Sequence, residues 1–179
     1  MLFLSSLVFA ADPAAVREIR QLYQAGKAAQ AEQLVKHTAR LNANDRSYAA
    51  VGTYGRSMVA WVRPDPVGET SVVLVEADTL TAAWRVDLEV LYHDGRPRFV
   101  LVEQLYDHPL RVYLDAKGEP VRLQVGEVAY DTLDAKQKAF VAKVAGWAGR
   151  LHDEAKRLDG FMEPGLDPED VGPHLGEAE

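Results

Sequence analysis

Hydrophobic and polar residues follow a helical period at both ends of the chain and a period of two between them. Near the start, apolar side chains recur every three or four residues. This spacing predicts a short amphipathic helix capped by Asp12, with Pro13 at its first position and an end at Gly26. The buried stripe of this helix would contain Val16, Ile19, Leu22 and Tyr23.

A longer helix is predicted toward the end of the chain. Asp134 and Gln137 have the spacing of a capping box, and Gly160 is a natural residue just beyond a helix. Such a helix is not stable alone, so its apolar stripe must cover a sheet or a partner. The stripe would contain Phe140, Val144, Trp147, Leu151, Ala155 and Leu158.

Between the helices, the alternation predicts a series of strands. The segment from Val35 to Leu41 alternates, although its beginning is also compatible with an extension of the first helix. Later strands are predicted in MVAWVR, TSVVLVEA, TAAWRVDLEVLYH, RPRFVLVE, LRVYLD and EPVRLQV. The predicted fold class is α+β: an antiparallel β-meander of about six to seven strands packed by an N-terminal helix and a long C-terminal helix. The alternative is a cone-like curved sheet around an interior cavity, as in nuclear-transport-factor-like domains.

The dipeptide Asp94-Gly95 sets the predicted register of the longest hairpin. Asp-Gly is preferred in a two-residue type I′ turn, and such a turn pairs His93 with Arg96. Continued along the strands, this register pairs Val86 with Glu103. Glu103 would then project from an apolar face, where an ionised carboxylate is costly and a protonated one can act as a general acid. The alternative places Glu103 at the rim, in contact with solvent or an Arg.

The opposite face of this hairpin carries Arg85, Asp87 and Glu89. Carboxylates at positions i and i+2 lie about 7 Å apart on one face, a separation compatible with acid and base catalysis. A solvated, salt-bridged strand has the same pattern. We therefore treat these three residues as candidate binding residues on a sheet face that the helices leave uncovered, and Glu103 as the candidate catalytic residue.

Other motifs give little chemistry. The five histidines lack the spacing of a metal site, and neither a nucleophile elbow nor a phosphate-binding loop is present, so no cofactor and no metal are predicted. His37 alternates with apolar neighbours and fits a core or rim position. Aromatic residues along the strands fit the core, or a binding platform if they share an exposed face. They are Trp61, Trp84, Tyr92, Phe99 and Tyr113.

Composition bears on location and partners. The first ten residues, MLFLSSLVFA, are uncharged and end in a small residue, which predicts a signal peptide at 1–10, or else a merely apolar N-terminus. Residues 11–160 would form one domain, and 161–179 an acidic disordered tail with six acids and no Lys or Arg. The net charge of −7 therefore leaves only −1 outside the tail, which argues against nucleic-acid binding. Nor is any internal stretch apolar enough to cross a membrane.

Several segments resemble a loose group of exported bacterial proteins of unknown function. The similarity rests on VREIRQLYQ, YAAVG, TLTAAWRVDLEVLYHDGRPRFVLVEQ and HPLRVYLDAKGEPVRLQ, and covers roughly Val16 to Val125. That group has a short N-terminal helix, an Ala-Val-Gly segment and strands that end in Tyr/Phe-Asp-Gly turns. The resemblance implies export and a helix-plus-meander fold. It carries over no catalytic residues.

The sequence thus predicts a periplasmic or secreted protein that uses an uncovered sheet face as a non-enzymatic binding or structural module. Its partner would be an unknown protein or small ligand of the cell envelope, and a homodimer through the same face or the sheet edge is a further option. The alternative is a periplasmic hydrolase in which Glu103, or the pair Asp87 and Glu89, acts as acid and base.

Overall fold

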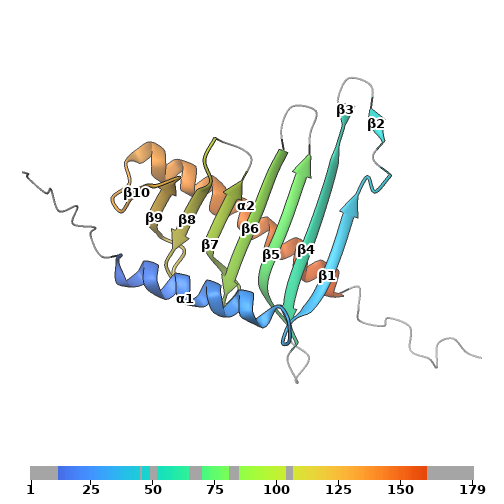
Figure 1. The fold of residues 1–179 in the computed structure, drawn as a ribbon, viewed down its shortest axis with the longest axis horizontal. Helices are drawn as coiled ribbons and strands as arrows, with labels where there is room; N and C mark the ends of the chain where they lie inside the picture. The colour runs from blue at the N-terminus through green and yellow to red at the C-terminus, as the bar shows by residue number, and fades with distance from the viewer. Residues whose placement is uncertain are drawn as a thin grey trace, which may run out of the picture.

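The computed structural model describes residues 12–44, 46–48, 52–64, 70–80, 85–103 and 107–160. The predicted signal peptide at 1–10, the predicted tail at 161–179 and Trp84 lie outside these ranges. The described chain forms three layers, in which one antiparallel sheet lies between two helices (Figure 1). The α+β class is confirmed, and the main sheet has eight strands, more than predicted.

The main sheet is a meander in which each strand pairs with its neighbour in the order of the chain. Its strands are β1 (Val35–Leu41), β4 (Gly55–Arg63), β5 (Ser71–Leu80), β6 (Arg85–His93), β7 (Arg96–Glu103), β8 (Leu110–Leu114), β9 (Pro120–Val125) and β10 (Val128–Tyr130). The short strands β2 (Ser47–Tyr48) and β3 (Gly52–Thr53) form a separate pair. β1 and β10 are therefore the two edges of the main sheet.

Helix α2 (Ala135–Gly160) covers one face of the sheet, which we call the α2 face. The predicted capping box is confirmed, because the Gln137 amide N–H donates to Asp134 Oδ1 at 2.8 Å and the Asp134 N–H donates to Gln137 Oε1 at 2.9 Å. The predicted burial of Trp147 is wrong, since this side chain is 37% exposed. The small Ala148 takes its place, which lets the helix approach Tyr92 closely enough for the hydroxyl to donate to the Ala148 carbonyl at 2.7 Å.

Helix α1 (Ala14–Ala29) covers part of the other face, which we call the α1 face. The predicted cap is wrong: Pro13 is the N-cap and Asp12 makes no capping hydrogen bond, because its carboxylate contacts Arg122 and Arg20. Four ion pairs join α1 and the residues just before it to the sheet. They are Asp12 to Arg122 at 2.6 Å, Glu18 to Arg98 at 3.0 Å, Lys27 to Glu89 at 3.1 Å and Lys27 to Glu76 at 3.4 Å.

The hairpin of β6 and β7 has the predicted turn, and its register then shifts. Asp94 and Gly95 have φ angles of 53° and 70°, as a type I′ turn requires, and His93 pairs with Arg96. Beyond Pro97 the register moves by one residue, because Arg98 is an extra residue in β7. Proline cannot donate to the ladder, and bulges accommodate it. The bulge also orients Arg98, whose Nε donates to the Leu114 carbonyl at 3.1 Å.

Candidate functional site

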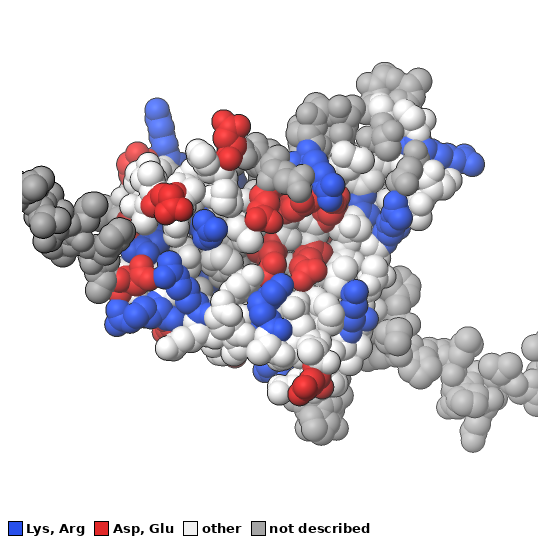
Figure 2. Space-filling view, in the orientation of Figure 1, with Lys and Arg blue, Asp and Glu red and all other residues white. Residues whose placement is uncertain are grey.

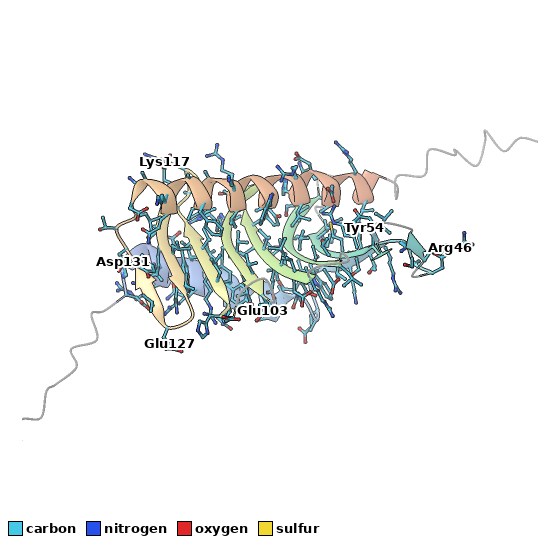
Figure 3. The ribbon with its side chains drawn as sticks, turned by 90° about the horizontal axis from the view of Figure 1, so that it is seen from above. Arg46, Tyr54, Glu103, Lys117, Glu127 and Asp131 are labelled. Atoms are coloured by element: carbon cyan, nitrogen blue, oxygen red, sulfur yellow. The ribbon has the colours of Figure 1, made fainter. Side chains whose placement is uncertain are left out.

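A group of acidic side chains occupies the part of the α1 face that α1 leaves uncovered. We call Glu76, Asp78, Asp87, Glu89 and Glu103 the acidic patch; they come from β5, β6 and β7. In Figure 2, acidic side chains gather in the middle of this face, just above α1. Figure 3 shows Glu103 on the side of the sheet away from α2.

The sheet register places these carboxylates directly opposite one another. Glu76 pairs with Glu89 and Asp78 with Asp87 across β5 and β6, and Asp87 pairs with Glu103 across β6 and β7. Like charges in directly opposed positions destabilise a sheet. The folded protein therefore holds an arrangement that opposes its own stability.

Two cations partly neutralise the patch. Lys27 Nζ lies 3.4 Å from Glu76 Oε1 and 3.1 Å from Glu89 Oε1, at the border with α1. Arg85 contacts Asp78, and its Nε lies 3.2 Å from Asp87 Oδ1. Five negative formal charges face two positive ones, so the group keeps a net charge of −3.

The electrostatics of the patch are visible in the pKa values around it. Burial, and then the neighbouring Asp78 carboxyl, raise the pKa of Asp87 above its ordinary value, although Arg85 acts in the opposite direction. Burial and the Glu89 carboxylate raise the pKa of the Tyr23 phenol. Burial opposes protonation of Lys27, but the Glu89 and Glu76 carboxylates raise the pKa of its ammonium group. Each of these groups is in an environment that favours a bound proton or a cation.

The carboxylates line an open depression of about 300 Å³. Val59 and Leu101 contribute apolar surface to its walls. The depression combines apolar surface with several acceptors, which is the composition of a binding site for a small ligand or for one or two side chains of a partner. It is also open to solvent, unlike an enclosed reaction chamber.

The structure brings all the predicted site residues into one place. Arg85, Asp87 and Glu89 share one face, but α1 covers part of that face, and its Lys27 contacts Glu89. The predicted register of Glu103 is wrong, because it pairs with Asp87 and not with Val86. The bulge at Arg98 is the cause, because a shift of one residue moves every later side chain to the other face. The exposure of Glu103 within the acidic patch agrees with the alternative that places it at the rim.

The sequence analysis missed Glu76 and Asp78. Both are in the predicted strand TSVVLVEA and its extension, at alternate positions after Leu74. A signal for them was present in the sequence. Glu76 and Asp78 are at positions i and i+2 of one predicted strand, and Asp87 and Glu89 have the same spacing on the next, so antiparallel pairing could bring the four acids together. Lys27 could not be found in this way, because its contact depends on how α1 crosses the sheet.

The aromatic residues are mainly core residues. Tyr92, Phe99 and Tyr113 are buried, Tyr92 on the α2 face and the other two beneath α1. Trp61 is half-buried, with Lys36 over its ring. The described aromatic side chains thus do not form the exposed platform that we considered as an alternative.

Within the described residues, no group of three or more His, Asp or Glu side chains is arranged to hold a metal ion. The same part of the chain contains no helix that is both long and apolar enough to cross a membrane. No protein-family model, curated protein or solved structure matches this chain. Its function must therefore be argued from the acidic patch itself.

Proposed function

We propose that the protein is a non-enzymatic binding module and that the acidic patch takes up a cationic group of a protein or small ligand. The observation that carries the proposal is the set of directly opposed carboxylates on β5, β6 and β7, which have too few cations of their own. A sheet face that only needs solubility mixes both signs of charge. A bound cation would reduce the repulsion between Asp78, Asp87 and Glu103, and its attraction to the half-buried Asp78 and Asp87 would be stronger than at a fully exposed position.

A titration of the full chain with a tetralysine peptide tests this proposal. The probe carries cationic side chains at a spacing that several carboxylates can meet together, and a tetraserine peptide controls for the backbone. We expect binding at low ionic strength that weakens as salt is added, because salt screens exposed charges. Chemical shifts should move first for residues of β5, β6 and β7.

Matched double variants separate a site from simple attraction to net charge. Asp87→Asn with Glu103→Gln removes two charges from the patch, whereas Asp94→Asn with Glu119→Gln removes two exposed charges elsewhere. We expect the first pair to weaken tetralysine binding about tenfold, since two exposed ionic contacts together contribute about 1.4 kcal/mol. The second pair should have little effect. Equal losses, or no binding by the unaltered chain, would contradict the proposal.

A carboxylate hydrolase is the second candidate function. The observation in its favour is the raised pKa of Asp87 beside Asp78, since two carboxyls with different environments can act as acid and base. The Asp87→Asn variant distinguishes the two candidate functions, because each predicts the loss of a different property. A hydrolase would lose turnover and keep its affinity for substrate, whereas a binding module would lose affinity and show no turnover in the unaltered chain.

We further propose that the protein is exported to the periplasm or secreted. The support is the uncharged segment MLFLSSLVFA, which ends in Val8-Phe9-Ala10 and is followed by Asp12-Pro13. Expression in a bacterium with fractionation and N-terminal mass spectrometry tests this. Export predicts an envelope or medium fraction whose first residue is Ala11, and a cytoplasmic chain that begins at Met1 would contradict it.

A further inference from the structure

The two edge strands of the sheet carry an unusual share of the exposed apolar surface. Among the described residues, seven large apolar side chains are exposed, and four of them are on β1 and β10. They are Val35, Leu41, Val128 and Tyr130. An edge strand also presents backbone N–H and C=O groups to any strand that can pair with it.

The same two edges carry opposite charges on the α1 face. On β1, Lys36 and Arg40 are four residues apart and pair with Trp61 and Ser57, which are on that face. Glu127 and Asp131 flank β10 and are also four residues apart. Figure 3 shows them at one end of the sheet, opposite the end that carries Arg46.

Alternation places Asp131 on the α1 face, and Figure 3 shows Glu127, which is in the turn before β10, on the side of the sheet away from α2. Ala129 pairs with Gln124, which is two residues beyond Arg122 on that face. The contact of Asp131 with Arg122 agrees with this assignment, and 49% of the Asp131 side chain remains exposed. Tyr130 pairs with Leu123 and therefore lies on the α2 face.

We propose that β1 of one copy of this chain pairs antiparallel with β10 of a second copy. One register opposes Lys36 to Asp131 and Arg40 to Glu127 on the α1 face. In the same register Ala39 meets Val128 on the α2 face. The first and last of eight alternating strands run in opposite directions, so a second copy in the same orientation continues the antiparallel sheet and keeps each face on its own side.

Charge also selects this pairing over the symmetric ones. Two β1 strands paired about Thr38 would place Lys36 opposite Arg40 of the second copy. Two β10 strands paired about Ala129 would place Glu127 opposite Asp131. Like charges in opposed positions destabilise both symmetric dimers, whereas the proposed pairing opposes unlike charges. The contact is therefore head-to-tail, and it can extend to rings or linear assemblies.

The test is sedimentation of the full chain over a series from micromolar to millimolar concentration, because a contact of a few residue pairs is weak. We expect the mean mass to rise with concentration and to fall as salt is added. Arg40→Glu and Glu127→Arg should each weaken association roughly tenfold, since each turns an attractive cross-strand pair into a repulsive one. Arg96→Glu and Glu119→Arg are matched controls at exposed positions outside β1 and β10.

The decisive measurement is a mixture of the two edge variants. In the mixture, the altered β1 of one variant faces the altered β10 of the other with unlike charges, and the two unaltered edges also match. Association should therefore return to the level of the unaltered chain. A monomer at every concentration, an equal loss in the controls, or a mixture that stays dissociated would overturn the proposal.

One competing occupant gives a different result. Residues 161–179 contain six acids and no Lys or Arg, so they have the charge to bind the β1 edge of their own chain. In that case the full chain stays monomeric, whereas a chain that ends at residue 160 associates. This outcome would assign the β1 edge to the C-terminal segment and overturn the pairing between full chains.

Discussion

Leu91 and Asp87 are on the same strand and point to the same face of the sheet, yet their environments are opposite. Leu91 is 2% exposed beneath α1, where Gly26 lets the helix come close. Asp87 is 26% exposed in the acidic patch, about 13 Å further along β6 at the usual rise of a strand. The α1 face is therefore two surfaces, an apolar one covered by the helix and an acidic one left open.

The difference shows that strand alternation decides which face a side chain is on, whereas the length and path of a helix decide whether that face is buried. The longer helix α2 crosses the whole sheet (Figure 1). The α2 face is therefore covered along its length, and its buried residues are apolar at both ends of the central strands. The shorter α1 covers only one end of the central strands. The open end is consequently the place where the chain is free to carry polar chemistry.

Loss of a covered apolar side chain should have the largest effect. Leu91→Ala removes a buried side chain between β6 and α1, and we expect it to lower the free energy of unfolding by about 2 to 5 kcal/mol. Leu80→Ala is the control: this leucine is on the same face but at the open end, and it is 38% exposed. Urea unfolding measures both. Equal losses would mean that the two parts of the face do not differ in burial.

Several parts of this arrangement could be predicted from local sequence. Periodicity gave both helices, Asp94-Gly95 gave the turn, and alternation along β6 gave Arg85, Asp87 and Glu89 a common face. These features depend on neighbouring residues only. For the same reason periodicity could not choose between Trp147 and Ala148, which are adjacent on α2 and differ in how closely they let the sheet approach.

The features that could not be predicted from local sequence depend on irregularities of the backbone and on contacts between distant segments. The bulge at Arg98 reverses the face of Glu103, and its only local signal is Pro97 within a strand. A second bulge follows Pro120 in the next hairpin, where Val121 is the extra residue. A proline two or three positions after a hairpin turn is thus a reason to distrust any register extended beyond it.

Lys27 lies at the border between the covered and open parts, and its removal should have the next largest effect. Lys27→Met leaves the buried Oε1 of Glu89 without its cation, so we expect a loss of about 1 to 3 kcal/mol of stability. Lys27→Arg should restore most of it, because the charge is kept. Lys117→Met, in an exposed turn, serves as the control in the same urea titration. If Lys27→Met proved as stable as the unaltered chain, the border would not depend on this ion pair.

Acidification should change stability in opposite directions through His152 on the α2 side and Asp87 on the α1 face. His152 is buried on the α2 side, and burial, aided by Lys156, lowers the pKa of its imidazole. The unfolded chain then takes up the proton more readily than the folded one, so stability falls as the pH drops below about 6.5, the ordinary value for histidine. His152→Gln should flatten this part of the profile relative to the unaltered chain. Thermal unfolding between neutral pH and pH 5 measures the slope.

The smallest expected effect is a gain in stability on replacement of Asp87 by Asn. The raised pKa of Asp87 means that the folded protein binds this proton more tightly than the unfolded chain does. Its stabilising contribution is therefore complete below the unfolded pKa, about 3.9, and is lost as the pH rises through the folded value. At neutral pH the ionised carboxylate opposes folding, so Asp87→Asn should stabilise the protein by about 0.5 kcal/mol. The gain should vanish at acidic pH.

Two comparisons make the Asp87→Asn result specific to the acidic patch. Asp94→Asn alters an 89% exposed carboxylate and should change stability little at neutral pH. Tetralysine should raise the melting temperature of the unaltered chain more than that of Asp87→Asn, because the bound cation relieves a repulsion that the variant no longer has. A carboxylate that costs stability in the free protein and recovers it with a cation is consistent with selection for binding. If Asp87→Asn instead destabilised the protein at neutral pH, its pairing with Arg85 would outweigh the repulsion, and the acidic patch would be a structural ion-pair network.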